Sequence, residues 1–427
     1  MFEELKGKKL LWLGGIPRAA YVIKRAMQLG IYVIVADIDE TNPGKEIANE
    51  AYNIDAMDVD SLTELCLKES IDGIMTGYCD ILLPSVLEVS KRASIPCYMT
   101  EDMISAATNK GFFKSLCEKY NVPVPHNYEI DKADLEKSAK SLSYPVFIKP
   151  LDASGSRGAD VCNDSSEFVE KYEYALSFSK QGDVVVEDFL SGTEFILDYL
   201  IVDGKPYLLS MADRYTIEGR GAAINSPNLM ILPSKNLNRY VDTVTKKVEN
   251  MFVESGFENG LIFLQGYADE NRIAFYEMGC RLGGTWPYID EYFTGLNPMD
   301  LLFSHSLTGK MLNNGNPDSI SPFFNGYAAI IYYMSSQAEG TIGEILGIEE
   351  LQSKPWVVDV MQFYHVGDSF DMERQTDVRF LSTNIVAENI NELRERVKYA
   401  YELIKVNDVE GNNLLSKYVD IDMVTEG

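Results

Sequence analysis

The chain has 427 residues, a formal net charge of −27, and 46% hydrophobic and 24% charged residues. This length predicts roughly two or three domains, and the composition is ordinary for a soluble globular protein. The negative charge argues against nucleic acid or an anionic membrane as a partner, because both need clustered Lys and Arg. It leaves nucleotide binding open, since a few cations focused in a cleft are enough to bind one phosphate-bearing ligand.

The sequence shows no sign of a targeting or membrane segment. The N-terminus carries acidic residues and no hydrophobic stretch, so no signal peptide is expected. No apolar run approaches the ~20 residues that a membrane span needs. Scattered cysteines without a Cys-x-x-Cys pair indicate reduced, mostly buried thiols, and the histidines are too far apart in sequence to suggest a zinc site. We therefore expect a cytoplasmic protein.

Residues 8–107 alternate between strand-like and helix-like segments. Strand-like runs fall at 9–15, 32–37 and 73–76, and helix-like segments at 18–29 and 61–70. Strands that alternate with helices predict a parallel, doubly wound sheet.

A dinucleotide-binding site is an alternative interpretation of this segment. Gly14 opens the first turn, and Asp37 ends the second strand about twenty residues later, where a ribose-binding acid would lie. The turn reads Gly-Gly-Ile-Pro-Arg-Ala-Ala from Gly14 and lacks the three-glycine spacing of that motif. A nicotinamide oxidoreductase therefore ranks third among the functions considered.

A strand that carries a lysine follows a helix-like segment at 109–120. Lys149 lies in the strand-like run 145–150, and burying its charge is costly unless an anion meets it. The loop 154–158 that comes next, Ser-Gly-Ser-Arg-Gly, offers backbone N–H groups that can fold over phosphates. The alternative is an edge-strand lysine beside an ordinary surface turn.

The strand-like run 182–187 leads into a third candidate segment. Its connection to the next strand can offer backbone donors and acceptors to an adenine edge near Glu187 and Leu190. Glu194 can accept hydrogen bonds from ribose hydroxyls. Solvent-side carboxylates in an acidic protein are the alternative for both glutamates.

A hairpin predicts a metal site. The runs 261–264 and 273–276 read as strands, with turn residues at 269–271 between them. Such a hairpin places the Gln265 amide beside the Glu277 carboxylate, and oxygen ligands of this kind suit Mg2+ that arrives with a nucleotide triphosphate. A solvated strand end is the alternative.

Other segments are less specific. Strand-like pieces are expected at 326–334 and 356–366 and a final helix at 391–404, and no low-complexity linker separates the domains. Arg214 and the segment 219–221, which contains Arg220, could reach a second substrate, although a solvated turn explains them as well.

Taken in order, these signals resemble the ATP-grasp superfamily over essentially the whole chain. The lobe after residue 326 looks like that of the biotin carboxylase, carbamoyl-phosphate synthetase and L-amino acid ligase branches, with turns at 340–342 and 366–368. The resemblance implies an α/β and α+β fold: an N-terminal doubly wound parallel sheet, an ATP-grasp core of two α+β subdomains, and a C-terminal β-rich lobe. The implied boundaries are 1–107, 108–190 (small subdomain, or lid), 191–320 (large subdomain with the metal site) and 321–427.

The resemblance also implies roles for individual residues. Lys110 and Lys149 would bind the α- and β-phosphates, and Ser154, Gly155, Ser156 and Gly158 would close over the triphosphate. Glu187 and Leu190 would contact adenine, and Glu194 would contact the ribose. Gln265 and Glu277 would bind Mg2+, with Mn2+ as an alternative metal. Arg281 would steady the reacting carboxylate or acyl phosphate, and Gly283 with Gly284 would border the substrate. Gly279 departs from the family, which usually has Asn there, so two full metal sites are not assured.

The implied activity is an ATP-dependent carboxylate–amine ligase that forms an acyl phosphate and releases ADP and phosphate, with the joining of amino acids as one such reaction. Its partners would be small carboxylates and amines, and relatives of this lobe arrangement are often homodimers. A bicarbonate-using carboxylase or carbamoyl-phosphate-type enzyme, and a nucleotide-binding protein without turnover, remain alternatives.

Overall fold

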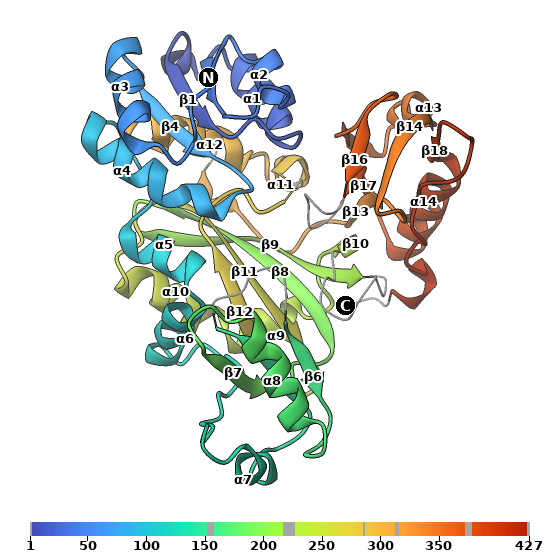
Figure 1. The fold of residues 1–427 in the computed structure, drawn as a ribbon. Coiled ribbons are helices and arrows are strands. Elements are labelled where there is room, and N and C mark those ends of the chain that lie inside the picture. The colour runs from blue at the N-terminus through green and yellow to red at the C-terminus, as the bar shows by residue number, and fades with distance from the viewer. Residues whose placement is uncertain are drawn as a thin grey trace.

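The computed structural model describes residues 2–151, 158–216, 227–284, 287–311, 316–371 and 378–424. Ser154, Gly155, Ser156 and the segment 219–221 therefore lie outside the described residues. Figure 1 shows three regions: an N-terminal sheet, a large central sheet that a smaller sheet faces, and a C-terminal lobe. None of the described helices is long and apolar enough to cross a membrane.

The N-terminal region is built on a four-stranded parallel sheet with the strand order β3-β2-β1-β4. The strands β1, β2 and β4 are buried and mostly apolar, and helices cover both faces of the sheet, which is the arrangement that the alternating pattern predicts. Its elements are η1 (Glu3–Leu5), β1 (Lys9–Leu13), α1 (Ala19–Gln28), β2 (Tyr32–Ala36), α2 (Pro43–Ile47), β3 (Glu50–Tyr52), α3 (Val59–Glu69), β4 (Gly73–Thr76), η2 (Asp80–Leu82), α4 (Leu83–Ala93) and α5 (Glu101–Thr108).

The smaller sheet that faces the central sheet is antiparallel, with the strand order β6-β5-β7. Val146, Ile148 and Val186 point to one side of it, into a core with α8, so the alternate residues Phe147 and Lys149 point to the other side. The elements are α6 (Lys110–Lys119), α7 (Leu135–Lys140), β5 (Val146–Pro150), β6 (Asp160–Cys162), α8 (Phe168–Phe178) and β7 (Val184–Asp188).

The central sheet has eight strands in the order β12-β11-β8-β9-β10-β13-β17-β15, and each neighbouring pair is antiparallel. It continues from β10 to β13, so strands on both sides of residue 321 pair with each other, and the four predicted domain ranges stay predictions. The elements are β8 (Thr193–Val202), β9 (Lys205–Thr216), β10 (Pro227–Leu232), α9 (Leu237–Thr243), α10 (Thr245–Glu254), β11 (Gly260–Ala268), β12 (Ile273–Gly279), α11 (Pro287–Thr294), α12 (Pro298–Thr308), η3 (Pro317–Ser319), β13 (Tyr327–Met334), β15 (Val357–Gln362) and β17 (Arg379–Ala387).

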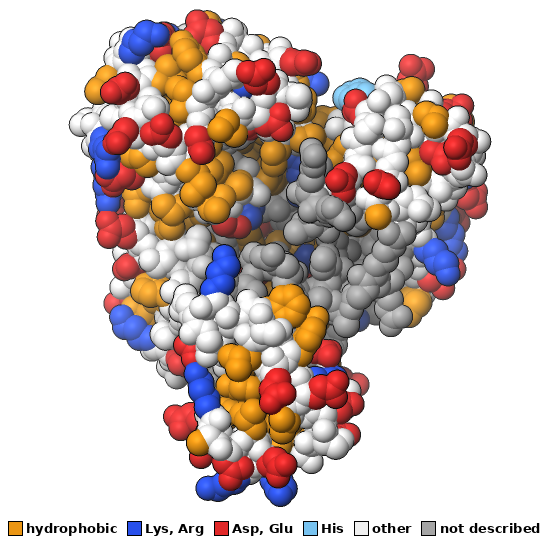
Figure 2. Space-filling view, viewed as in Figure 1, with side chains coloured by type: hydrophobic (Ala, Val, Ile, Leu, Met, Phe, Trp, Pro, Cys, Tyr) orange, Lys and Arg blue, Asp and Glu red, His pale blue; other side chains and the backbone are white. Residues whose placement is uncertain are grey.

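The C-terminal lobe packs a three-stranded sheet, β16-β14-β18, and α14 onto the β13–β17 end of the central sheet through one shared core. The predicted strand pieces and final helix are present as β13, β15 and α14. The remaining elements are β14 (Glu339–Leu346), α13 (Ile348–Gln352), β16 (Ser369–Asp371), α14 (Ile390–Leu403), β18 (Lys405–Asp408) and η4 (Ile421–Met423). On the face shown in Figure 2, Lys and Arg side chains are dispersed among acidic ones and form no continuous basic surface.

Candidate functional site

A cavity of about 800 Å³ is lined by residues of both the small sheet and the central sheet. Residues from α6, β5, β7, β8, β9, β11 and β12 line it. Eight of the residues singled out from the sequence meet there, although they are spread over more than 160 positions: Lys110, Lys149, Glu187, Leu190, Glu194, Arg214, Gln265 and Glu277. Gly158 and Arg281 are not among the lining residues.

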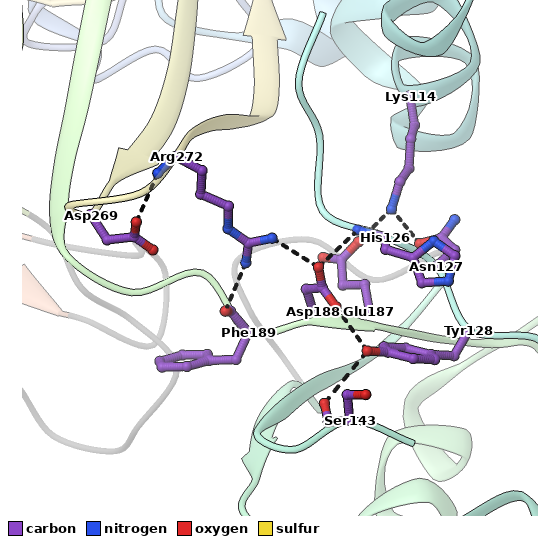
Figure 3. Close-up of polar contacts among 10 residues, drawn as sticks. All are labelled: Lys114, His126, Asn127, Tyr128, Ser143, Glu187, Asp188, Phe189, Asp269 and Arg272. Carbon is purple, nitrogen blue, oxygen red and sulfur yellow. Dashed lines mark hydrogen bonds and ion pairs between the residues drawn. The ribbon is translucent and has the colours of Figure 1, made fainter. Parts of the chain in front are cut away.

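One end of the cavity is rich in lysine. Lys149 forms an ion pair with Glu187 on the neighbouring strand. Lys114 Nζ lies 3.1 Å from the other oxygen of the same carboxylate, a contact that Figure 3 shows. Lys110 lies close by, where burial lowers its pKa, the charge of Lys149 lowers it further, and Glu277 and Glu187 oppose the shift. Lys149 and Lys114 thus hold the Glu187 carboxylate between them, and together with Lys110 they bring an excess of positive charge that favours an anionic ligand.

The segment between β7 and β8 is held in place from both sides, as Figure 3 shows. Arg272, in the β11–β12 turn, donates to Asp188 at 2.8 Å and to the carbonyl of Phe189 at 3.3 Å. The Tyr128 hydroxyl donates to the other oxygen of Asp188 at 2.9 Å. Residues 189–192, including the predicted Leu190, border the cavity, so their backbone is presented on a fixed support.

Gln265 and Glu277 lie directly opposite each other in the β11–β12 hairpin, as the sequence predicts. The register shifts after Gln265, which leaves Tyr276 as an extra residue in β12. A bulge of this kind breaks the strict alternation of a strand, and consecutive residues can then face the same side. Tyr276 and Glu277 accordingly both line the cavity.

Tyr276 joins three of the lining side chains. Its hydroxyl lies 2.8 Å from Gln265 Oε1 and also bonds to Glu194. Arg214 Nη1 donates to Glu194 at 2.7 Å and to the Tyr276 hydroxyl at 3.2 Å. The sequence suggested Arg214 only as a contact to a second substrate, whereas the structure places it in this cavity, directly opposite Glu194 in the β8–β9 register. Tyr276 was missed because nothing in its local sequence marks the bulge.

The Glu277 carboxylate is enclosed by the protein but accepts no hydrogen bond from the residues that the structure describes. Burial raises its pKa, and the positive charges of Lys110, Arg214 and Arg281 oppose the shift. Across the described ranges, no side chain or backbone group donates a hydrogen bond to it, and no cluster of three or more His, Cys, Asp or Glu side chains could bind a metal alone. A metal at this end of the cavity would therefore take further oxygen ligands from a bound ligand or from water.

Arg281, just after β12, binds the loop that follows β4 in the N-terminal region. Its Nε and Nη2 donate to the two oxygens of Asp80 at 2.7 and 2.6 Å, and its Nη1 donates to the carbonyl of Leu282 at 2.8 Å. The guanidinium also lies over the ring of Phe263, 5.4 Å from its centroid. The contact joins Arg281 to Asp80, 201 positions apart in the chain, and no sequence motif predicts it.

Close neighbours leave little space for a side chain at two glycines, Gly279 and Gly158. A Cβ on Gly279 would lie 2.1 Å from the Phe263 ring, so a side chain at this position would require the ring to move. Gly158 has φ +74°, and a Cβ on it would meet Phe178 at 2.8 Å. Only Gly158 of the predicted phosphate loop is described, and its backbone requires glycine.

Comparison with known proteins agrees with this geometry. Residues 109–297 match the family model described as the ATP-binding domain of the carbamoyl-phosphate synthase L chain. Every cavity residue predicted from the sequence falls within that match. This segment is similar to that ATP-binding domain, and the resemblance to the ATP-grasp superfamily predicted from the sequence is confirmed.

Individual relatives are distant. The chain is 27% identical over 206 residues to the formate-dependent phosphoribosylglycinamide formyltransferase of Sulfurisphaera tokodaii, a match that covers 46% of this chain and 51% of that protein. The chain thus spans about half the length of this curated relative.

Two solved structures share the fold over nearly the whole chain. The L-amino acid ligase from Bacillus licheniformis has a TM-score of 0.74 at 20% identity and covers 94% of this chain and 98% of its own. The biotin carboxylase domain of the 2-oxoglutarate carboxylase from Hydrogenobacter thermophilus, solved with MgADP and bicarbonate, has a TM-score of 0.75 at 20% identity, with 94% and 91% coverage. These likenesses confirm the predicted fold class.

Proposed function

We propose that the protein is an ATP-dependent carboxylate–amine ligase that works through an acyl phosphate and releases ADP and phosphate. The observation that carries the proposal is one cavity whose lining residues include Lys110 and Lys149 together with the Gln265–Glu277 pair. A triphosphate between them would meet positive charge along its length and, at its γ-phosphate, a metal bound to the hairpin.

We expect the nucleotide to lie in the cavity in one direction. Lys110 and Lys149 would contact the α- and β-phosphates, and the loop 154–158 would close over them. Backbone groups near Leu190 would face adenine, because the Glu187 side chain is already held by Lys149 and Lys114. Glu194 would accept from the ribose hydroxyls while Arg214 fixes its carboxylate.

Gln265 and Glu277 fit a Mg2+ ion, or Mn2+ in its place. The amide oxygen of Gln265 and the free oxygens of Glu277 are hard ligands on adjacent strands, and phosphate oxygens would complete the coordination. The bound metal would neutralise phosphate charge.

The chemistry requires no nucleophile from the protein. A substrate carboxylate oxygen attacks the γ-phosphorus, the bond from that phosphorus to the β–γ bridging oxygen breaks, and ADP leaves. An amine then attacks the acyl carbon, the carbon–oxygen bond to phosphate breaks, and the nitrogen loses a proton. Lys149 and Arg281 would position and neutralise charge during these steps.

One observation favours a second candidate, a protein that binds nucleotide without turnover. Phe263 fills the space where most family members carry an Asn ligand, so the hairpin brings fewer metal ligands than usual. A carboxylase or carbamoyl-phosphate-type enzyme is a variant of the first proposal, in which bicarbonate takes the place of the organic acid.

The assembly and location belong to this proposal as well. We take 1–107, 108–190, 191–320 and 321–427 as the functional units, with a homodimer as the expected assembly. All six cysteines are free in the structure, which supports a reducing, cytosolic location.

The deciding experiment measures phosphate release from Mg-ATP with pooled amino acids and small carboxylates present or absent. Release that depends on the pool, with ADP as the nucleotide product, supports the ligase. ATP binding without release under any mixture supports the non-catalytic candidate, and absence of ATP binding contradicts both.

A further inference from the structure

The hydroxyl group of Tyr276 has more acceptors around it than it has protons. Glu194 Oε1 and Gln265 Oε1 both lie within hydrogen-bond distance of it, the latter at 2.8 Å. A tyrosine hydroxyl carries one proton, so it can donate to only one of these two oxygens at a time. Arg214 Nη1 donates to the same hydroxyl oxygen at 3.2 Å and takes up one of its two lone pairs. Two acceptors thus compete for one proton, and one lone pair of Tyr276 is left over.

The charged acceptor has the advantage in this competition. Glu194 is a carboxylate whose side chain is 11% exposed, whereas the Gln265 amide is neutral. Hydrogen bonds to a charged acceptor are stronger than those to a neutral one. When the hydroxyl proton lies on the Glu194 side, Gln265 Oε1 faces the oxygen of Tyr276 with no proton between the two atoms.

Turning the Gln265 amide over removes this conflict. Half a turn about the last side-chain bond exchanges the amide oxygen and the NH2 group. The NH2 group then donates to the remaining lone pair of Tyr276, and the hydroxyl has all three of its hydrogen bonds. The amide oxygen no longer faces Tyr276 and is available to another partner.

This orientation matters for a metal and for the residue type at position 265. Mg2+ binds oxygen ligands, and an amide NH2 group has no lone pair to offer it. Gln265 lies directly opposite Glu277, the other expected ligand. A carboxylate in place of the amide would have no N–H to donate to Tyr276 and would bring a second negative charge close to Glu194, which is unfavourable in a partly buried site. The amide is therefore the group that suits this hydroxyl.

We propose that Tyr276 is a positioning residue that couples the nucleotide-binding carboxylate of Glu194 to the metal: it donates to Glu194, accepts from the turned amide of Gln265, and so keeps the Gln265 oxygen available to Mg2+. This inference rests on the proposed nucleotide and metal site. It adds to that site a residue that acts on the metal through Gln265.

The test measures the binding of a non-hydrolysable ATP analogue to the full-length chain by titration calorimetry, once with Mg2+ and once with EDTA. The ratio of the two dissociation constants reports what the metal contributes to binding. We expect Tyr276→Phe to weaken binding by about tenfold with Mg2+, because the oxygen ligand loses its support. The loss with EDTA should be less than about twofold, since Arg214 still holds Glu194 at 2.7 Å.

A double-mutant cycle with Gln265→Glu tests whether the amide is the link. Both oxygens of the carboxylate that this substitution introduces are acceptors, so it needs no N–H donor contact to present an oxygen. Adding Tyr276→Phe to Gln265→Glu should therefore change the ratio by less than about twofold, whereas Tyr276→Phe alone should change it by about fivefold or more.

Tyr207→Phe is the matched control. The hydroxyl of Tyr207 donates to the Asp318 carboxylate at 3.0 Å, and Tyr207 lies in β9 of the same sheet but not among the residues that line the cavity. Its substitution removes the same kind of hydrogen bond and should leave both dissociation constants unchanged. Melting curves for all variants show whether each is folded at the temperature of the titration.

The outcomes separate the claims. Equal weakening by Tyr276→Phe with Mg2+ and with EDTA, or an equal effect of Tyr276→Phe in both backgrounds, overturns the role of Tyr276 and leaves the nucleotide site intact. Equal affinity of the wild type with Mg2+ and with EDTA overturns the metal site and this inference. Failure of the wild type to bind the analogue under either condition overturns the proposed function as well.

Discussion

Lys149 and Glu187 face the same side of the small sheet and form an ion pair inside the cavity, and Lys114 binds the second oxygen of that carboxylate at 3.1 Å. Glu187 therefore orients Lys149 as well as offsetting its charge. The lysine reaches the cavity from a mostly buried strand, and its position depends on a partner 38 residues away in the chain.

We expect Lys149→Ala to weaken ATP binding by roughly 10- to 100-fold, which is about 1.4 to 2.7 kcal/mol, because a phosphate contact to a point charge is lost. Titration calorimetry with a non-hydrolysable ATP analogue measures this. Lys132→Ala is the control, since Lys132 pairs with Asp183 on the surface and its side chain is 59% exposed. Equal affinity in Lys149→Ala and in the wild type would contradict the phosphate assignment.

Glu277→Ala should remove turnover, with a loss of about 100-fold or more, because the metal-bound charge at the γ-phosphate is lost. The melting temperature should not fall, since the buried carboxylate is replaced by an apolar group. Glu270→Ala, an exposed position in the turn of the same hairpin, should retain activity. Substrate-dependent phosphate release measures both variants, and normal release from Glu277→Ala would refute the metal site.

Tyr276→Phe should raise KM for ATP by about tenfold, because the hydroxyl that bonds to Glu194 and Gln265 is lost. Tyr267→Phe is a close comparison: its ring lies 5.7 Å from that of Tyr276 and lines the same cavity. We expect steady-state kinetics to show little change for Tyr267→Phe. The bridging role of Tyr276 fails if the two variants behave alike.

Gly279→Asn should destabilise the protein by about 1 to 3 kcal/mol, because its side chain would overlap the Phe263 ring. Combining it with Phe263→Ala should make the substitution less costly than it is alone, which is a non-additive result. Denaturant unfolding of the four species of this cycle gives the interaction energy. If the two changes in the free energy of unfolding simply add, the Phe263 ring is not the reason that position 279 is a glycine.

Asp359 gives a pH-dependent prediction. Burial raises its pKa from 3.8 to about 6, and Oδ2 accepts no hydrogen bond from the part of the chain that the structure describes. The folded state therefore holds this proton more tightly than the unfolded state, and stability falls as the pH rises through about 4 to 6. Asp359→Asn should stabilise the protein at pH 7.5 by up to about 3 kcal/mol and lose that advantage below about pH 4. Melting temperatures across this range test it, and an advantage independent of pH would contradict it.

The sequence predicts this site well wherever the signal is local. Lys149 is unusual within an apolar strand, and Gln265 and Glu277 flank a recognisable turn, so their pairing follows from the hairpin itself. The parallel N-terminal sheet also follows from the alternation of strands and helices over residues 8–107.

Contacts between distant segments could not be predicted in this way. The Arg281–Asp80 pair depends on how the N-terminal sheet packs against the end of β12. The inward position of Tyr276 depends on a bulge, and the fit of Phe263 against Gly279 depends on the register of two strands. Each of these is set by tertiary packing, which residue types and spacing do not encode locally.

The most direct test of the central claim follows one oxygen atom. Substrate carboxylate labelled with 18O is turned over with Mg-ATP and an amine, and the released phosphate is analysed by mass spectrometry. An acyl phosphate transfers one carboxylate oxygen to phosphate, so the account predicts one labelled oxygen in each phosphate released. Phosphate without label, in the presence of turnover, would show that water attacks ATP and would contradict the ligase mechanism.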